Sequence, residues 1–313
     1  MSTLERTRLI ASDIDGTILS YSSTETGVVS PRTVAAFRAA RDAGLRVVLV
    51  TGRPVRWLKP VADALGGIGP VICSNGAVVY DLAQDRLLHE DPMDARTLFA
   101  VKDQVLTIDP EASFAAETLE HLHAERPFLK DSLFFEEDRR RAAGVTDEML
   151  RLGPLDETLE RDALGAAATP HSDVTVDHLA DRVVKLLVKT TVMDADAFLA
   201  QVRDQVGHLV TVTHSAPGVS LLELSAKGVD KAAALRRFAA AEQIRQDEVI
   251  AFGDMPNDIE MLQWAGTSWA VGSAHPLVRS AAEHVTGDCD DDGVALVLED
   301  LLAGGDGVLC RTS

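Results

Sequence analysis

The stretch that decides the fold is Leu9-Ile10-Ala11-Ser12-Asp13-Ile14-Asp15-Gly16-Thr17. Its first four residues form a short and mostly apolar run, which predicts a buried strand. Two carboxylates two residues apart follow directly, and Gly16 permits a tight turn beside them. Ligands of open α/β sheets bind beyond the carboxyl ends of the strands. The pattern therefore predicts a strand that delivers Asp13 and Asp15 to a polar site.

Two more apolar runs follow at the spacing of a βαβ unit. Ser30 and Pro31 have the composition of a helix start, and Gly44 lies where that helix would end. The runs 45–50 and 70–73 are almost continuously apolar, as in parallel strands that are covered on both faces. The first third of the chain therefore predicts a parallel sheet.

The alternation of strand and helix patterns returns in the last third of the chain. Asp230 precedes a helical pattern, the run 249–252 predicts a strand that ends at Gly253, and 269–271 predicts a short last strand.

The middle third differs, because it is more charged and alternates between apolar and polar residues at 174–177 and 210–213. We expect an α/β protein with a Rossmann-like parallel-sheet core domain, residues 1–85 and 223–313, and an inserted α+β domain, residues 86–222.

Composition excludes several classes of function. The 313 residues include 30 Lys and Arg against 49 Asp and Glu, a formal net charge of −19. That balance argues against nucleic acid and against an anionic membrane as partners. A bound cation can reverse the field locally, so an anionic small molecule remains possible. Three widely spaced cysteines without a CxxC pair, and no 18-residue apolar run, favour a reduced, cytoplasmic protein that does not span a membrane.

Four polar clusters lie at strand ends or helix starts of this scheme. They are Asp13-x-Asp15-Gly16-Thr17, Thr51-Gly52-Arg53, Lys227 to Lys231, and Gly253-Asp254-x-x-Asn257-Asp258. Together they offer carboxylate oxygens, a hydroxyl and an ammonium. Hard oxygen ligands suit Mg²⁺, and a carboxylate nucleophile can form an aspartyl-phosphate.

In order and spacing, these clusters resemble the four motifs of the haloacid dehalogenase-like (HAD) phosphohydrolase superfamily along the whole chain. The middle block follows the third strand and Ser74-Asn75-Gly76-Ala77, which is similar to the type-2 caps of Cof-type phosphatases, subclass IIB. The resemblance implies the HAD fold with a type-2 cap that sets specificity. It also implies a Mg²⁺-dependent phosphatase for a small phosphorylated metabolite such as a sugar phosphate.

The resemblance further implies a role for each matching residue. Asp13 would be the nucleophile, and Asp15 the general acid that later activates water. Thr51 and a lysine would hold the phosphoryl oxygens. The implied metal ligands are Asp13, Asp15 through its backbone carbonyl, Asp254 and Asp258. The implied substrate- and phosphate-binding residues are Gly16, Gly52, Arg53, Asn75, Lys227 and Asn257.

Several alternatives remain open at this point. Lys231 lies just inside a helix start, where anions bind, and is favoured over Lys227 as the phosphate lysine. Arg53 and Asn75 could contact the substrate or only fix a turn. We expect His121 and His123 on a helix surface in preference to a position facing the substrate. A monomer and a homodimer are equally consistent with the sequence.

Three rival functions also remain. The same chemistry would serve a sugar-ester phosphatase of the sucrose-, trehalose- or mannosylglycerate-phosphate type, or a phosphomutase. A non-catalytic metabolite-binding protein of the same fold is disfavoured by the complete set of chemical groups.

Overall fold

A computed structural model describes residues 6–23, 27–130, 146–160, 183–215 and 218–305. The chain divides into two compact units, Met1–His89 with Asp230–Ser313, and Glu90–Val229. The second unit is therefore an insertion in the first, and its ends lie a few residues after the domain limits proposed from the sequence.

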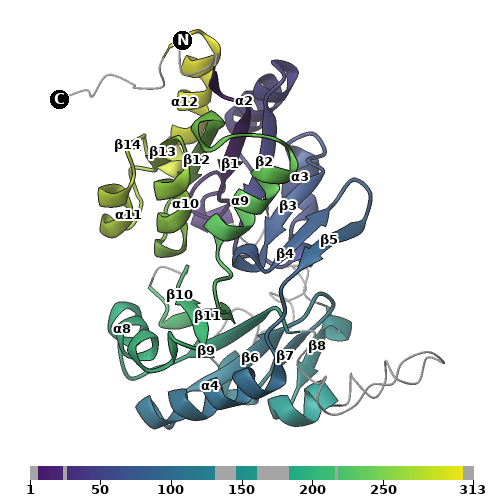
Figure 1. Ribbon diagram of the computed structural model, residues 1–313, viewed down its shortest axis with the longest axis vertical. Helices are drawn as coiled ribbons and strands as arrows, with labels where there is room; N and C mark the ends of the chain where they lie inside the picture. The colour runs from purple at the N-terminus through teal and green to yellow at the C-terminus, as the bar shows by residue number, and fades with distance from the viewer. Residues whose placement is uncertain (1–5, 24–26, 131–145, 161–182, 216–217, 306–313) are drawn as a thin grey trace. The chain divides into compact units, whose positions relative to one another are not determined.

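The first unit contains an eight-stranded sheet in the order β14-β13-β12-β1-β2-β3-β4-β5 (Figure 1). The strands from β14 to β3 run parallel, and β4 is antiparallel to β3. The α/β class with a largely parallel sheet is confirmed. The strands are β1 (Leu9–Ser12), β2 (Arg46–Val50), β3 (Pro70–Cys73), β4 (Val78–Asp81), β5 (Arg86–Glu90), β12 (Val249–Gly253), β13 (Thr267–Ala270) and β14 (His284–Val285).

The centre of this sheet is β1, which lies between β2 and β12. Ile10 pairs with Val47 on one side and with Ile250 on the other. All four residues of β1 are buried, as its apolar run predicts. The last strand predicted, at 269–271, is β13, but a further strand, β14, follows it. With only two residues, β14 is too short to leave a hydrophobic pattern.

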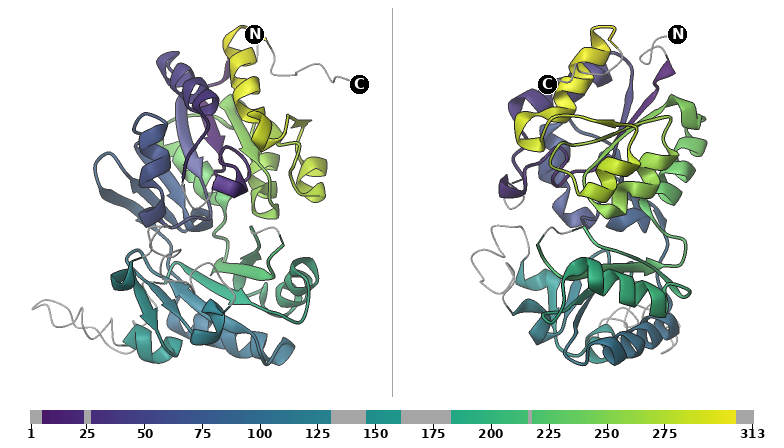
Figure 2. Two further views of the ribbon diagram at one scale, coloured as in Figure 1. Left: turned by 180° about the vertical axis from the view of Figure 1, so that it is seen from behind. Right: turned by 90° about the vertical axis from the view of Figure 1, so that its left-hand side faces the viewer.

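Helices cover both faces of the sheet, with α2 and α12 on one face and α9 and α10 on the other (Figures 1 and 2). The predicted helix starts are confirmed. The Ser30 hydroxyl accepts from the backbone N–H of Thr33 at 3.1 Å, and Asp230 Oδ1 accepts from Ala233 at 2.7 Å. The helices are α2 (Pro31–Asp42), α3 (Lys59–Ala64), α9 (Lys231–Ala241), α10 (Ile259–Trp264), α11 (Pro276–Ala281) and α12 (Gly293–Leu302).

The second unit contains a six-stranded sheet in the order β10-β11-β9-β6-β7-β8. The pairs are antiparallel except for β7 and β8. The run 210–213 is strand β10, as its alternation predicts, whereas 174–177 lies outside the described residues. The elements are α4 (Ala95–Ile108), β6 (Ser113–Glu117), β7 (Leu122–Ala124), α5 (Arg126–Leu129), β8 (Leu150–Leu152), β9 (Lys185–Lys189), α8 (Ala195–Val206), β10 (Val210–Thr213) and β11 (Leu221–Ala226).

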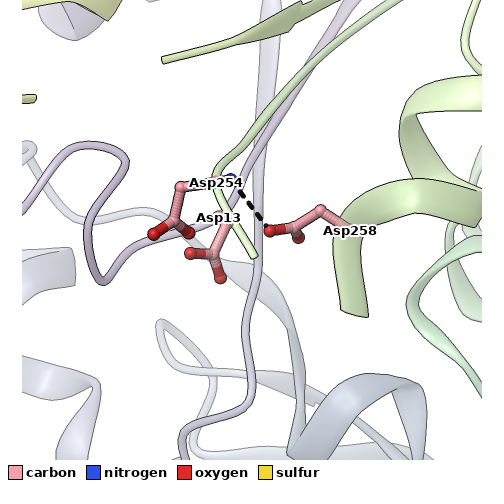
Figure 3. A group of neighbouring side chains, drawn as sticks. All are labelled: Asp13, Asp254 and Asp258. Carbon is pink, nitrogen blue, oxygen red and sulfur yellow. Dashed lines mark hydrogen bonds between the residues drawn. The ribbon is translucent and has the colours of Figure 1, made fainter. Parts of the chain in front are cut away.

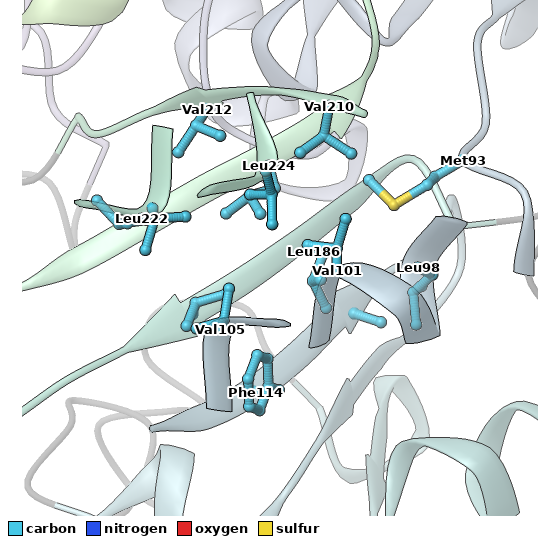
Figure 4. Packing of buried hydrophobic residues seen from close by; sticks show 14 of the residues in the cluster. Met93, Leu98, Val101, Val105, Phe114, Leu186, Val210, Val212, Leu222 and Leu224 are labelled. Atoms are coloured by element: carbon cyan, nitrogen blue, oxygen red, sulfur yellow. The ribbon is translucent and has the colours of Figure 1, made fainter. Parts of the chain in front are cut away.

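The core of the second unit is built on alternate positions of its strands. Leu186 of β9 and Leu224 of β11 pack with Val101 and Val105 of α4 in one buried cluster (Figure 4). The intervening residue Leu187 belongs to a second cluster on the other face of the sheet. The period of two in the sequence thus sorts side chains onto two faces.

Charged groups are buried in the second unit. The Lys185 ammonium lies 2.8 Å from Glu223 Oε1 and 3.3 Å from Glu117 Oε2, and all three side chains are less than one-tenth exposed. The helix-surface prediction for His121 and His123 is wrong, because His123 lies in β7 and is buried. A three-residue strand next to a turn gives too short a pattern to distinguish from a helix.

Among the residues that the structure describes, no helix combines the length and the apolar character needed to cross a bilayer.

Candidate active site

The sheet topology of the first unit brings one residue from each of the four polar clusters to the edge where its parallel strands end. Asp13 follows β1, and Asp254 follows β12, its parallel neighbour. Thr51 follows β2 on the other side of β1, and Lys231 is the first residue of α9. Neighbouring parallel strands end at the same edge, so residues more than 200 positions apart in the chain meet there.

Three buried carboxylates lie together at this edge. Asp13, Asp254 and Asp258 each contribute an oxygen, and these oxygens lie within 4.8 Å of one another. Figure 3 shows the Asp13 and Asp254 carboxylates side by side, with Asp258 reaching toward them from the next helical turn. The three residues are 5%, 3% and 0% exposed. Water therefore screens their mutual repulsion little.

One buried ammonium opposes these charges. Lys231 Nζ donates to Asp13 Oδ1 at 2.7 Å and to Asp258 Oδ1 at 2.6 Å, and the side chain is 1% exposed. Burial lowers the pKa of Lys231, but the two carboxylates outweigh burial and raise the pKa above its ordinary value. Lys231 is therefore a fixed positive charge beside Asp13.

A single ammonium does not balance three carboxylates. The pKa of Asp13 is raised to about 7, mainly by burial and also by the nearby Asp258 and Asp15 charges, against the opposing effect of Lys231. Burial and the nearby Asp13 and Asp258 charges likewise raise the pKa of Asp254 well above its usual range. A bound cation would relieve this excess of negative charge.

The donor set fits a hard divalent cation. Carboxylate oxygens from Asp13 and Asp254 are the ligands that such cations take in proteins. Asn257 Oδ1, in the same loop, is buried and has no hydrogen-bond partner among the described residues. This oxygen could accept a hydrogen bond from a water molecule that the cation holds.

Asp258 has a further structural task. Its Oδ2 accepts from the backbone N–H groups of Asp254 and Met255 at 3.0 and 3.1 Å. Together with the Lys231 contact, this carboxylate accepts three hydrogen bonds. Asp258 therefore fixes both the loop that carries Asp254 and the ammonium that faces Asp13.

The Asp15 side chain is held outside the carboxylate cluster. Arg53 Nε and Nη2 each donate to one oxygen of Asp15, both at 2.6 Å. The side chains are 9% and 23% exposed. Arg53 was expected either to contact a substrate or to fix a turn, and its observed partner is the carboxylate of Asp15. The metal-ligand role of Asp15 concerns its backbone carbonyl and stays a prediction.

The remaining predicted residues line the same loops. Asn257 Nδ2 donates to Asn75 Oδ1 at 3.0 Å, and both residues are buried. Thr51 is buried, and its hydroxyl accepts from the Arg53 N–H, with Gly52 between them. Gly16 has a φ of +76°, and a Cβ there would overlap the Asp254 carboxylate. This position therefore requires glycine.

Lys227 lies elsewhere. It belongs to the second unit, is exposed, and donates to the backbone carbonyl of Gly207. The ammonium that the structure brings to Asp13 is that of Lys231, and Lys227 has a different partner.

Two residues that contact the buried carboxylates were not predicted from the sequence. The Tyr21 hydroxyl donates to Asp254 Oδ2 at 2.6 Å. The Thr17 hydroxyl lies 3.5 Å from Asp13 Oδ2 and 3.4 Å from Asp254 Oδ1. Thr17 belongs to the first motif, but the resemblance implies no role for its hydroxyl. Tyr21 gives no pattern in the sequence, because only the path of the loop brings it back to Asp254.

Comparison with known proteins agrees with this geometry. A model of the haloacid dehalogenase-like hydrolases matches residues 10–298. The chain is 28% identical over 307 residues to the 5-amino-6-(5-phospho-D-ribitylamino)uracil phosphatase YwtE of Bacillus subtilis, a match that covers 95% of this chain and 99% of that protein. It is 26% identical over 289 residues to the pyridoxal phosphate phosphatase YbhA of Escherichia coli, covering 92% and 96% respectively.

Among solved structures, the chain is similar to the HAD subclass IIB sugar phosphatase BT4131. The TM-score is 0.69 at 19% identity, and the match covers 94% of this chain and 99% of that one. At this identity the likeness concerns the fold, and it extends over both units.

Proposed function

Since the chain belongs to the haloacid dehalogenase-like hydrolase family and is a Cof-type phosphatase within it, we propose that it hydrolyses a small phosphorylated metabolite through an aspartyl-phosphate on Asp13. Mg²⁺ is the cation that we propose for the site. The observation that carries the proposal is the Lys231 ammonium, which lies 2.7 Å from Asp13 Oδ1 and 2.6 Å from Asp258 Oδ1 of the carboxylate cluster.

In the first proposed step, a carboxylate oxygen of Asp13 attacks the phosphorus atom of the substrate. A bond forms between that oxygen and phosphorus, and the bond from phosphorus to the leaving alcohol oxygen breaks. Asp15 supplies the proton that the leaving oxygen takes up. The products of this step are the free alcohol and the phosphorylated Asp13.

In the second proposed step, a water molecule attacks the phosphorus of the aspartyl-phosphate. Asp15, now a carboxylate, accepts a proton from this water. The bond between phosphorus and the Asp13 oxygen breaks, which releases inorganic phosphate and restores Asp13. Lys231 and the Thr51 hydroxyl stabilise the phosphoryl oxygens as negative charge develops on them.

Asp13 and Asp254 would hold the cation, with Asp258 and Asn257 fixing the loop and its waters. When bound, Mg²⁺ offsets the repulsion between a carboxylate nucleophile and an anionic phosphate. The backbone carbonyl of Asp15 is the further ligand that the family resemblance implies.

We propose the substrate class from the relatives. Two of them are named for 5-amino-6-(5-phospho-D-ribitylamino)uracil and for pyridoxal phosphate, and a structural neighbour is named a sugar phosphatase. Each of these named substrates is a phosphorylated small molecule. The second unit, inserted in the first, would then act as the cap that selects among such molecules. Cys73 and Cys289 carry thiols and are not joined in disulfides, which suits a reducing cytoplasm.

The test is phosphate release from a panel of phosphate monoesters that includes these two compounds and several sugar phosphates. The purified protein is assayed with Mg²⁺ and with EDTA. We expect release that requires Mg²⁺ and is lost in Asp13→Asn. Asp63→Asn is the matched control, because Asp63 is an exposed partner of Lys59.

Other results would contradict the proposal. Near-normal turnover by Asp13→Asn would remove Asp13 from the nucleophile role. An isomerised product without free phosphate would indicate a phosphomutase. Tight binding of a panel member without any turnover would favour a metabolite-binding protein.

A further inference from the structure

The first unit contains a hollow at the end of the sheet opposite the carboxylates, where the parallel strands begin. Its volume is about 570 Å³, and Arg38, Arg41, Arg46, Pro70 and Phe238 are among the residues that line it. Arg46 is the first residue of β2, whereas Thr51 follows its last residue. At about 3.3 Å per residue, one strand length of roughly 15 Å separates this hollow from the catalytic edge.

Two arginines in this hollow lack an acidic partner. Arg38 Nη2 donates to the carbonyl of Ala64 at 2.8 Å, and Arg41 Nη1 donates to the carbonyls of Leu65 and Gly66 at 3.2 and 2.7 Å. In the described part of the chain, neither guanidinium forms an ion pair. Both side chains therefore keep their positive charge without a carboxylate beside them in the described structure.

The two guanidinium groups approach each other over Gly66. Arg41 Nη1 lies 3.0 Å and Arg38 Nε 3.4 Å from the point that a Cβ of Gly66 would occupy. Gly66 has a φ of +94°, so a side chain is disfavoured there in any case. The carbonyls that end α3 offset part of the repulsion between these two charges, and an anion bound beside both would reduce it further.

The donors that remain suit a phosphate group. A guanidinium has five N–H donors in a planar fork, and the carbonyl contacts use one nitrogen of each arginine. Arg46 adds a third positive charge, although its Nη1 pairs with Glu242 at 2.6 Å. Asp42 is the one acidic residue in the lining, and it is exposed.

The rest of the hollow is apolar and includes a ring. Phe238 is half-buried on α9, and Pro70 begins β3. An aromatic ring in the lining offers a surface on which a flat heterocycle can stack. The volume lies in the range of pockets that hold small ligands and cofactors.

We infer that this hollow is a binding site for a nucleoside monophosphate, with the phosphate at Arg38 and Arg41 and the base against Phe238. It is separate from the catalytic edge and does not depend on the proposed phosphatase reaction. No covalent step is involved.

The test is isothermal titration calorimetry of the full-length protein with adenosine monophosphate. The protein is first treated with EDTA, which prevents metal-dependent turnover. We expect binding that falls at least tenfold in Arg38→Gln/Arg41→Gln. Arg32→Gln is the control, because Arg32 lies on the same helix but pairs with Glu299. Loss of binding in the control as well, or retention in the double variant, would overturn the proposal.

Arg38 and Arg41 also cap the end of α3, so the double variant can lose binding by unfolding. Two further variants test the site without removing these contacts. Arg46→Gln leaves those contacts intact and should weaken binding severalfold. Phe238→Leu should weaken adenosine monophosphate but leave ribose 5-phosphate unchanged. Equal loss of both ligands in Phe238→Leu would contradict stacking of the base.

Binding must also be independent of the catalytic edge. Asp13→Asn should bind adenosine monophosphate as the wild type does. Loss of binding in Asp13→Asn would place the nucleotide among the carboxylates and overturn the inference, whatever the outcome of the phosphatase assay.

Discussion

Arg53 binds both carboxylate oxygens of Asp15, with Nε 2.6 Å from Oδ2 and Nη2 2.6 Å from Oδ1. A two-point contact of this kind suits a carboxylate, which accepts through both oxygens. This is the form that takes a proton from water in the second proposed step. To act as the acid of the first step, Asp15 must carry a proton and release at least one of these hydrogen bonds.

The pair predicts the effect of Arg53→Lys. Lysine keeps the charge but offers a single point contact in place of the fork, so Asp15 is less precisely oriented. We expect kcat to fall about tenfold or more, with a smaller change in KM, as for a group that acts in the transition state. Steady-state phosphate release measures both constants.

Arg32→Lys is the control for this change, because Arg32 forms a similar two-point contact with Glu299 on the surface. It should leave kcat unchanged. Equal rates in Arg53→Lys and the wild type would show that orientation of Asp15 by Arg53 is unimportant.

A second prediction separates the two candidate lysines. Lys231→Met removes the only ammonium found beside Asp13 and Asp258 in the described structure and leaves two buried carboxylates facing each other. We expect a loss of unfolding free energy of about 3–5 kcal/mol without metal, measured by urea denaturation. Turnover should vanish, because the phosphoryl oxygens lose their cationic partner.

Lys227→Met is the matched variant. Lys227 is exposed and donates to a carbonyl, so its loss should change stability by less than about 1 kcal/mol and leave turnover intact. Loss of turnover in Lys227→Met with retention in Lys231→Met would reverse the proposed assignment.

A third prediction concerns pH and metal. Burial raises the pKa of Asp13 to about 7, so below that pH the folded, metal-free protein keeps a proton on a proposed ligand. Metal binding must displace this proton. Affinity for Mg²⁺ should therefore rise with pH through about 7, and the raised pKa of Asp254, the second proposed ligand, adds to this rise.

Calorimetric titration with Mg²⁺ in buffers of different ionisation enthalpy measures both the affinity and the protons released. We expect more proton release near pH 6 than near pH 8. An affinity that is constant between these values would contradict ligation by Asp13.

The raised pKa of Asp13 also determines how the stability of the metal-free protein changes with pH. The folded pKa of Asp13 lies above its ordinary value of 3.8, so the folded state binds the proton more tightly than the unfolded state. The metal-free protein should lose stability as the pH rises from about 4 to 7. Thermal denaturation with EDTA tests this, and saturating Mg²⁺ should flatten the decline. An increase of stability in this range would show that other groups dominate.

A fourth prediction concerns Tyr21. Its hydroxyl donates to Asp254 Oδ2 at 2.6 Å and fixes the orientation of a proposed metal ligand. Partners of this kind commonly change metal affinity by 10–100-fold. Tyr21→Phe should therefore weaken Mg²⁺ binding about tenfold, measured by calorimetry on the EDTA-treated protein.

Tyr80→Phe provides the comparison. The Tyr80 hydroxyl donates to Asp85 Oδ1 at 2.7 Å, away from the carboxylate cluster. Mg²⁺ affinity should be unchanged in this variant. Equal affinities in the two variants would mean that Asp254 does not need its tyrosine partner.

Sequence patterns predict those parts of the fold that repeat a local rule. The buried run of β1, the Ser30 and Asp230 caps and the apolar β3 each follow from neighbours in the chain. β14 and β7 do not, because two or three residues carry no period. Long, regular elements therefore follow from the sequence, and very short ones depend on the strands they join.

The site divides in the same way. Asp13, Asp254 and Lys231 follow strand ends or begin a helix, so the topology itself brings them together. The Arg53–Asp15 pair and the Tyr21–Asp254 hydrogen bond depend on loop paths and rotamers, which no spacing encodes. The sequence also gives no sign that Lys227 would turn to Gly207.

The central position of β1 has a consequence for synthesis of the chain. Leu9 pairs with Arg46 on one side, but its partner on the other side, Val249, is translated much later. At roughly 5–20 residues per second, that edge of β1 waits at least ten seconds or so for β12. During this interval a nascent chain exposes an apolar strand edge and lacks Asp254, so neither the sheet nor the metal site can be completed until the last third emerges from the ribosome.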